Sequence, residues 1–177
     1  MNMKTTAASP DIDLAPLPDA VRARCRGPMP RPDADTIIEL VTCAPDGWPH
    51  VAQLSVRELD LGDDGLIRLA LWRNSRTAEA LATAEAAVVL FVGASGIFEV
   101  RCRLVSVDGL DTEIELTGFL LAPVAVRNKQ APYAEILSGS RFRLFDPSEA
   151  ERRWVQTLQA LRARFPPRLA TTQEEIR

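Results

Sequence analysis

The chain has 177 residues, of which 46% are hydrophobic and 25% charged, with a formal net charge of -3 and a pI near 5.3. This length and composition are typical of one globular domain with its own core. The acidic balance leaves no broad basic surface, so we expect no nucleic-acid partner. No apolar run approaches the roughly 20 residues of a membrane span and no signal peptide is recognisable, which predicts a cytoplasmic protein without a membrane partner.

The three cysteines, Cys25, Cys43 and Cys102, have no metal-type spacing. We interpret them as free thiols, with Cys43 and Cys102 as small hydrophobic residues of strands.

The sequence predicts that the chain has three parts. Residues 1–32 contain six of the thirteen prolines, which excludes a continuous helix. We therefore expect a proline-rich N-terminal arm over 1–32, with a short helical turn near Pro18 to Arg24. A domain over 33–146 should follow, and then a C-terminal amphipathic helix with a polar tail over 147–177.

Apolar and β-branched runs alternate with turn sequences from residue 36 onward. Strands are predicted over 36–43, 50–59, 66–72, 87–92, 98–104 and 114–120, with a short last strand at 141–145. Turns are predicted where Gly47 and Gly65 follow aspartates. Residues 123–139 should be irregular, with a short helix around 133–137.

Two helices have clear start signals. Ser75 is a good N-cap for a helix that follows the third strand, and Asp146 with Pro147 begins a second helix. The second helix carries one apolar stripe, formed by Trp154, Leu158, Leu161 and Phe165. The chain is therefore predicted to be mainly β, with six or seven antiparallel strands in a small closed or partly closed barrel and flanking helices.

The start of the first of these helices could bind a phosphate. Ser75, Arg76 and Thr77 bring hydroxyls and one guanidinium to the free N–H groups and the positive dipole end of a helix. The alternative is an ordinary capped helix with a surface arginine.

The usual catalytic residue sets are missing. There is no glycine-flanked nucleophilic serine, no Walker loop and no dinucleotide fingerprint. His50 is the only histidine, which excludes a histidine-rich metal site and favours a structural role for this residue.

The order of these elements resembles the pyridoxamine 5'-phosphate oxidase-like flavoproteins over about residues 36–107. The matching features are a turn at Asp46-Gly47, Pro49-His50 at the start of a strand, a hairpin at Asp64-Gly65, a strand, Ser75-Arg76-Thr77, a helix and an apolar strand over 87–92. The resemblance implies an antiparallel split β-barrel of Greek-key type. It also implies a homodimer with flavin mononucleotide (FMN) at its interface.

The resemblance assigns the cofactor phosphate to Ser75, Arg76 and Thr77, with Thr77 where the family commonly has lysine. Arg57 is the candidate for a compensating cation. The resemblance also places the isoalloxazine ring along the second and third strands, with the contact residues Gln53, Leu54, Ser55, Val56, Ala70, Leu71 and Trp72. For Gln53, Ser55 and Arg57 the alternative is the solvated face of a half-exposed strand.

The resemblance thus implies an FMN-dependent oxidoreductase that transfers hydride through the flavin to or from a small molecule. No catalytic residue is assigned, and the C-terminal arginine and tryptophan pattern of true pyridoxamine 5'-phosphate oxidases is absent. A non-catalytic flavin-binding or sensing protein is the alternative. A further alternative is a split-barrel protein that binds a deazaflavin, or haem held by His50.

Overall fold

The computed structural model describes residues 12–26, 35–93 and 96–167. Its helices and strands are α1 (Asp19–Cys25), β1 (Ile37–Cys43), β2 (Pro49–Ser55), the 3-10 turn η1 (Val56–Glu58), β3 (Leu59–Leu61), β4 (Ile67–Trp72), α2 (Arg76–Ala84), β5 (Ala86–Gly93), β6 (Gly96–Gly109), β7 (Leu116–Lys129) and α3 (Pro147–Arg164). None of the helices in these residues is long and apolar enough to span a lipid bilayer.

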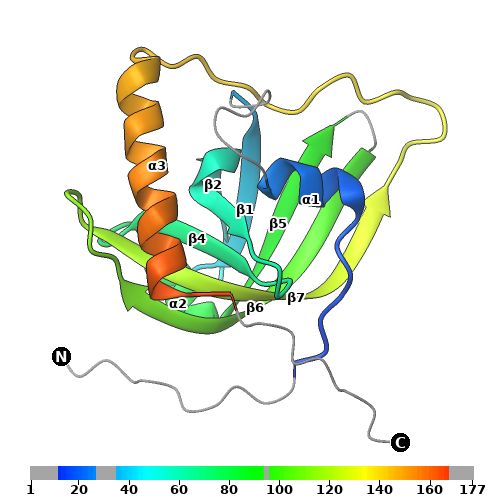
Figure 1. Ribbon diagram of the computed structural model, residues 1–177. Helices are drawn as coiled ribbons and strands as arrows, with labels where there is room; N and C mark the ends of the chain where they lie inside the picture. The colour runs from blue at the N-terminus through cyan, green and yellow to red at the C-terminus, as the bar shows by residue number, and fades with distance from the viewer. Residues whose placement is uncertain (1–11, 27–34, 94–95, 168–177) are drawn as a thin grey trace, which may run out of the picture.

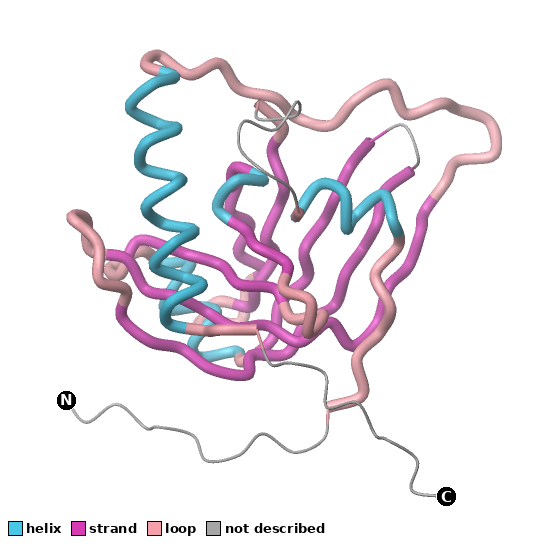
Figure 2. Tube along the Cα trace, viewed as in Figure 1, coloured by secondary structure: helices cyan, strands magenta, loops and turns pink. Residues whose placement is uncertain are grey.

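The seven strands form one antiparallel sheet in the order β2-β1-β5-β6-β7-β4-β3. The edge strands β2 and β3 are joined directly by η1, so the sheet must curl to bring its two edges together (Figure 1). The tube in Figure 2 shows the strands wrapping around the region that α1 enters. This curled half-barrel is the split-barrel-like, mainly β fold expected from the sequence.

The main core fills the concave side of the sheet. Val21 and Cys25 of α1 are fully buried there together with Leu40, Val89 and Phe91. The short helix predicted near Pro18 is therefore confirmed, and the described part of the N-terminal arm packs on the barrel of its own chain.

A second apolar cluster lies between the sheet and α3. Ala70, Leu110 and Leu116 meet Leu158 and Leu161 of the predicted stripe. Phe165 belongs to this cluster, whereas Trp154 is buried outside it, nearer the N-terminus of α3. The side chain of Asp146 accepts a hydrogen bond from the Glu149 N–H, which confirms the predicted cap of α3.

The strand predicted over 50–59 is wrong in its second half. Ser55 and Glu58 form a capping box, in which the Ser55 hydroxyl accepts from the Arg57 N–H and the Glu58 carboxylate accepts from the Ser55 N–H. Because these local bonds fix a helical turn, the strand stops at Ser55 and the chain turns from one sheet edge to the other.

The segment after residue 120 also differs from the prediction. Strand β7 continues through Pro123 to Lys129. The missing N–H of Pro123 is tolerated because this residue lies opposite Cys102, where a register shift interrupts the hydrogen bonding between β6 and β7. Residues 133–137 form no helix, and the strand predicted at 141–145 is reduced to a single bridge between Thr36 and Arg141.

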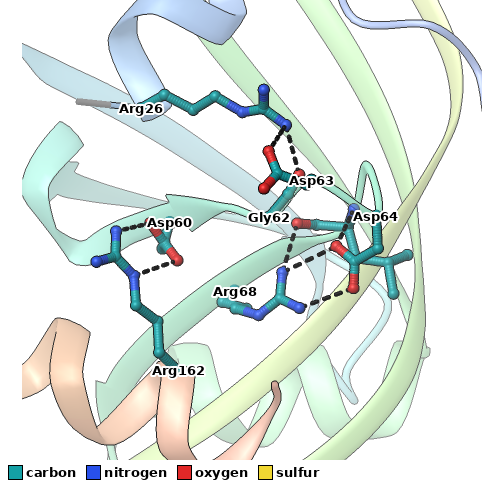
Figure 3. A network of polar contacts seen from close by, with 8 residues as sticks. Arg26, Asp60, Gly62, Asp63, Asp64, Arg68 and Arg162 are labelled. Carbon is teal, nitrogen blue, oxygen red and sulfur yellow. Dashed lines mark hydrogen bonds and ion pairs between the residues drawn. The ribbon is translucent and has the colours of Figure 1, made fainter. Parts of the chain in front are cut away.

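The β3–β4 hairpin ties α1 and α3 to the sheet (Figure 3). Arg26, which follows α1, donates to the Gly62 carbonyl at 2.7 Å. Arg162 of α3 donates to both carboxylate oxygens of the buried Asp60, at 2.9 and 2.7 Å. The buried Arg68 is paired with Asp64 at 2.8 Å and also donates to the Phe165 carbonyl at the end of α3.

Candidate functional site

The N-terminus of α2 has the arrangement expected for an anion site. Ser75 is the N-cap, and its hydroxyl accepts from the Ala78 N–H at 3.1 Å. Arg76 is the first residue of the helix and is exposed. Within residues 12–26, 35–93 and 96–167 its guanidinium has no hydrogen-bond or ion-pair partner. An available cation thus lies at the positive end of the helix dipole.

Thr77 is connected to the only histidine of the chain. Its hydroxyl lies 3.0 Å from Nε2 of His50, which is at the start of β2. This contact joins α2 to β2 through the imidazole of His50. The Thr77 hydroxyl can accept from or donate to the imidazole but carries no charge.

Four of the predicted ring-contacting residues line one pocket beneath the first half of α3. Leu54 of β2 and Ala70, Leu71 and Trp72 of β4 form one wall, and the remaining lining residues are Glu58, Ile114, Leu116, Arg153, Trp154 and Thr157. The cavity measures about 40 Å³. Pockets for drug-sized ligands have volumes of roughly 300–1,000 Å³, so this space is too small for an isoalloxazine ring.

The remaining β2 residues do not join this pocket. Gln53 is exposed on the outer face of the sheet, and Val56 is fully buried in the main core. Ser55 is also buried, and its hydroxyl caps η1. The alternation predicted for this segment therefore holds only as far as Leu54.

Arg57 occupies a different place from the one the resemblance suggests. Its side chain is 1% exposed, and its guanidinium carbon lies 5.2 Å from the centroid of the Trp154 ring. Its guanidinium is therefore buried beside Trp154 of α3, whereas Arg76 is exposed to solvent. The cation–π contact with Trp154 gives Arg57 a packing role between η1 and α3.

Glu58 is a polar pocket residue that the sequence interpretation missed. Burial raises the pKa of its carboxyl above the ordinary value, while the hydrogen bond from the Ser55 N–H and the charge of Arg153 act in the opposite direction. The Ser-x-x-Glu spacing of residues 55–58 was the available signal, because it is the pattern of a capping box. Arg153, Trp154 and Thr157 had no such signal, since only the packing of α3 brings them to the pocket.

Two of the larger hollows on the surface of the described residues lie elsewhere. One, of about 470 Å³, lies on the outer face of the sheet between Val41 of β1, Val88 of β5 and Arg101 of β6. The other, of about 670 Å³, lies between residues 109–113 and the second half of α3. In the described part of the chain, no three His, Cys, Asp or Glu side chains gather as metal ligands.

Comparisons with known proteins place the chain in a family. No protein-family model matches the sequence. A similar solved structure is an F420 reductase, with a TM-score of 0.44 and 15% identity over 58% of this chain and all of that one. Another is an FMN-binding protein from Thermus thermophilus, with a TM-score of 0.41 and 14% identity over 58% of this chain and 77% of that one.

The sequence comparison gives a nearer relative. The uncharacterized protein YclD of Bacillus subtilis (strain 168) is 35% identical over 125 residues, which cover 70% of this chain and 80% of YclD. At this identity and coverage, the chain belongs to the same protein family as YclD.

Proposed function

We propose that this chain binds FMN through the N-terminus of α2. The observation that carries the proposal is the exposed Arg76 guanidinium, which has no partner among the described residues and lies at a helix start capped by Ser75. Free N–H groups, the helix dipole and one guanidinium suit a phosphate ester. Thr77 adds a hydroxyl beside them, and the sequence resemblance supplies the identity of the ligand.

The flavin ring would lie outside the pocket beneath α3. That pocket is too small for three fused rings, whereas Trp72 at the end of β4 is 54% exposed and leads directly into the α2 turn. A large exposed indole beside the phosphate site is a suitable surface for an aromatic ring. We therefore assign Trp72 to ring contact, and we assign Leu54, Ala70 and Leu71 to the wall behind it.

A second copy of the chain would complete the site. The outer face of the sheet carries a hollow of about 470 Å³ lined mainly by apolar side chains, and the neighbouring Val51 of β2 is 55% exposed. Monomeric proteins rarely expose a large contiguous apolar patch, so this face is suited to a homodimer contact. Light scattering of the purified protein tests this, and a monomer whose state is unchanged by Val88→Asp would contradict it.

The bound flavin would supply hydride transfer, which makes a flavin-dependent oxidoreductase acting on a small molecule the first candidate function. The chain's own residues would hold the phosphate and cover one side of the ring. A non-catalytic flavin-binding protein is the second candidate, because Thr77 replaces a cation and engages His50. Oxidation of a reduced nicotinamide by the flavin-loaded protein would support the oxidoreductase, and complete inactivity would support the binding protein.

The binding experiment compares FMN with riboflavin, which lacks the phosphate. We expect the wild-type protein to bind FMN, and Arg76→Ala to weaken FMN binding about tenfold, the effect of one charge-assisted hydrogen bond. Riboflavin binding should not change. The matched control is Arg143→Ala, an exposed arginine in the segment between β7 and α3. Failure of the wild type to bind either compound would refute the proposal.

A further inference from the structure

Trp48 is a large apolar residue that is 75% exposed. It lies in the turn between β1 and β2, and hydrogen bonds fix this turn. The Trp48 N–H donates to Oδ1 of Asp46 at 3.1 Å, and the Trp48 carbonyl accepts from the Ala44 N–H at 2.9 Å. The indole therefore projects into solvent from an ordered hairpin.

This indole lies close to the start of α2. The bond between Ala44 and Trp48 continues the pairing of β1 with β2 by one residue, so Trp48 and His50 share one side of the hairpin. Two residues of a strand span about 7 Å. Because Nε2 of His50 is 3.0 Å from the Thr77 hydroxyl on the first turn of α2, this side of the hairpin faces the helix start.

A second exposed indole reaches the same helix start from a different strand. Trp72 ends β4 and is 54% exposed, and its carbonyl accepts from the N–H of the helix cap Ser75 at 3.0 Å. Strands β2 and β4 are not neighbours in the sheet. The N-terminus of α2, with the exposed Arg76 guanidinium, is thus an element that both tryptophans adjoin.

A phosphate site flanked by two aromatic surfaces suits a dinucleotide. In FMN the phosphate ends the molecule, so a flavin ring on Trp72 and a phosphate at Arg76 leave the Trp48 indole without a contact. In a flavin dinucleotide the chain of atoms continues through a second phosphate and a ribose to adenine. An exposed indole is a suitable surface for such a base, since stacking needs only two flat aromatic faces.

We propose that the α2 site extends to Trp48 and binds a flavin dinucleotide in preference to FMN, with the adenine stacked on the Trp48 indole. This inference rests on the proposed function for the phosphate at Arg76 and the flavin ring at Trp72. It adds a second aromatic base to the ligand, and it makes Trp48 the residue that distinguishes a dinucleotide from a mononucleotide.

The experiment compares flavin adenine dinucleotide (FAD) with FMN by calorimetric titration of the flavin-free protein. The two ligands have the same flavin ring and differ in the adenosine part. We expect the wild-type protein to bind FAD about tenfold more tightly than FMN, the effect of one base stacked on an aromatic side chain. In Trp48→Ala the ratio of the two affinities should fall to about one. The exposure of Trp48 means that this variant should fold.

Two further variants and one further ligand test the assigned role. Trp48→Phe keeps an aromatic ring and should retain most of the preference for FAD. Tyr133→Ala removes an exposed aromatic side chain between β7 and α3, and as the matched control it should retain the full preference. ADP carries the adenine without a flavin. It should compete with FMN for the wild-type protein, and several-fold less well for Trp48→Ala.

The same titrations define the contrary results. Equal affinity of the wild-type protein for FAD and FMN, or an unchanged ratio in Trp48→Ala, would overturn the proposal. A changed oligomeric state of Trp48→Ala in sedimentation would also overturn it, because Trp48 would then belong to a subunit contact. Failure of the proposed function appears as a wild-type protein that does not bind FMN, whereas this inference fails with FMN binding intact.

Discussion

Arg57 lies with its guanidinium carbon 5.2 Å from the ring centroid of Trp154, and both side chains are almost completely buried. This contact joins the 3-10 turn between the two sheet edges to the helix that covers the small pocket. Phe142 also packs against Trp154 in an edge-to-face contact, with the two ring centroids 6.5 Å apart. Trp154 is therefore the main packing residue of the first half of α3.

Truncation of Trp154 should be strongly destabilising. We expect Trp154→Ala to lower the free energy of unfolding by about 3–5 kcal/mol, the usual range for a buried tryptophan that leaves a cavity. Urea denaturation measures this value. The control is Trp48→Ala, whose side chain is 75% exposed and whose loss should change stability by less than about 0.5 kcal/mol. Equal effects of the two substitutions would contradict the packing role.

The Arg162–Asp60 pair should anchor the second half of α3. Asp60 is 4% exposed and accepts two hydrogen bonds from Arg162, so Arg162→Gln would leave a buried carboxylate without its cation. We expect a loss of about 1.5–3 kcal/mol in the free energy of unfolding, since the arginine itself is partly exposed. In a double-mutant cycle, Asp60→Asn combined with Arg162→Gln should cost less than the sum of the single changes. Additive effects would show that the two residues are not coupled.

Glu99 should make stability depend on acidic pH. Hydrogen bonds from Lys129 first and Arg101 second lower the pKa of Glu99 from 4.5 to about 2. The unfolded state therefore binds this proton more readily, and the stabilisation is present at neutral pH and lost as the pH falls from about 4.5 towards about 2. Thermal unfolding of Glu99→Gln should vary less steeply with pH in this window. The exposed Glu135→Gln is the control and should follow the wild-type curve.

The cysteines should differ sharply in reactivity. Cys43 is exposed at the end of β1, whereas Cys25 and Cys102 are buried. Burial, with a smaller contribution from the neighbouring Cys25, raises the pKa of the Cys102 thiol to about 12. A thiol reagent should label one cysteine quickly in the folded protein and all three after denaturation. Cys43→Ser should abolish the fast phase, and rapid labelling of Cys102 would contradict the structure.

Replacement of Thr77 by lysine should strengthen the proposed phosphate site. Thr77→Lys supplies a cation at the first turn of α2, and we expect FMN to bind about tenfold more tightly. The substitution also removes the 3.0 Å contact with His50, so a small loss of thermal stability should accompany it. Riboflavin is the control ligand, because it has no phosphate. An equal gain for riboflavin would place the new charge near the ring.

The sequence by itself determined most of the strands and the starts of the helices. The caps at Ser75 and Asp146 were predictable because each depends on a side chain and a backbone N–H only three residues away. The strands β1, β4, β5 and β6 were predictable from alternating and continuous apolar runs for a similar reason. Successive side chains of a strand point to opposite faces of the sheet, so a short stretch of sequence is enough to recognise the pattern. These features also carried the resemblance that gave the fold.

Only the tertiary structure decided which side chains meet. Ser55 and Arg57 looked like the polar face of one strand, yet the turn at η1 buries both, and α3 covers Arg57 with a tryptophan far along the chain. The small pocket likewise combines residues of η1 and β4 with residues of α3, which lies far along the chain. Local patterns contain no information about such partners, because burial and electrostatic environment arise only when distant elements pack together.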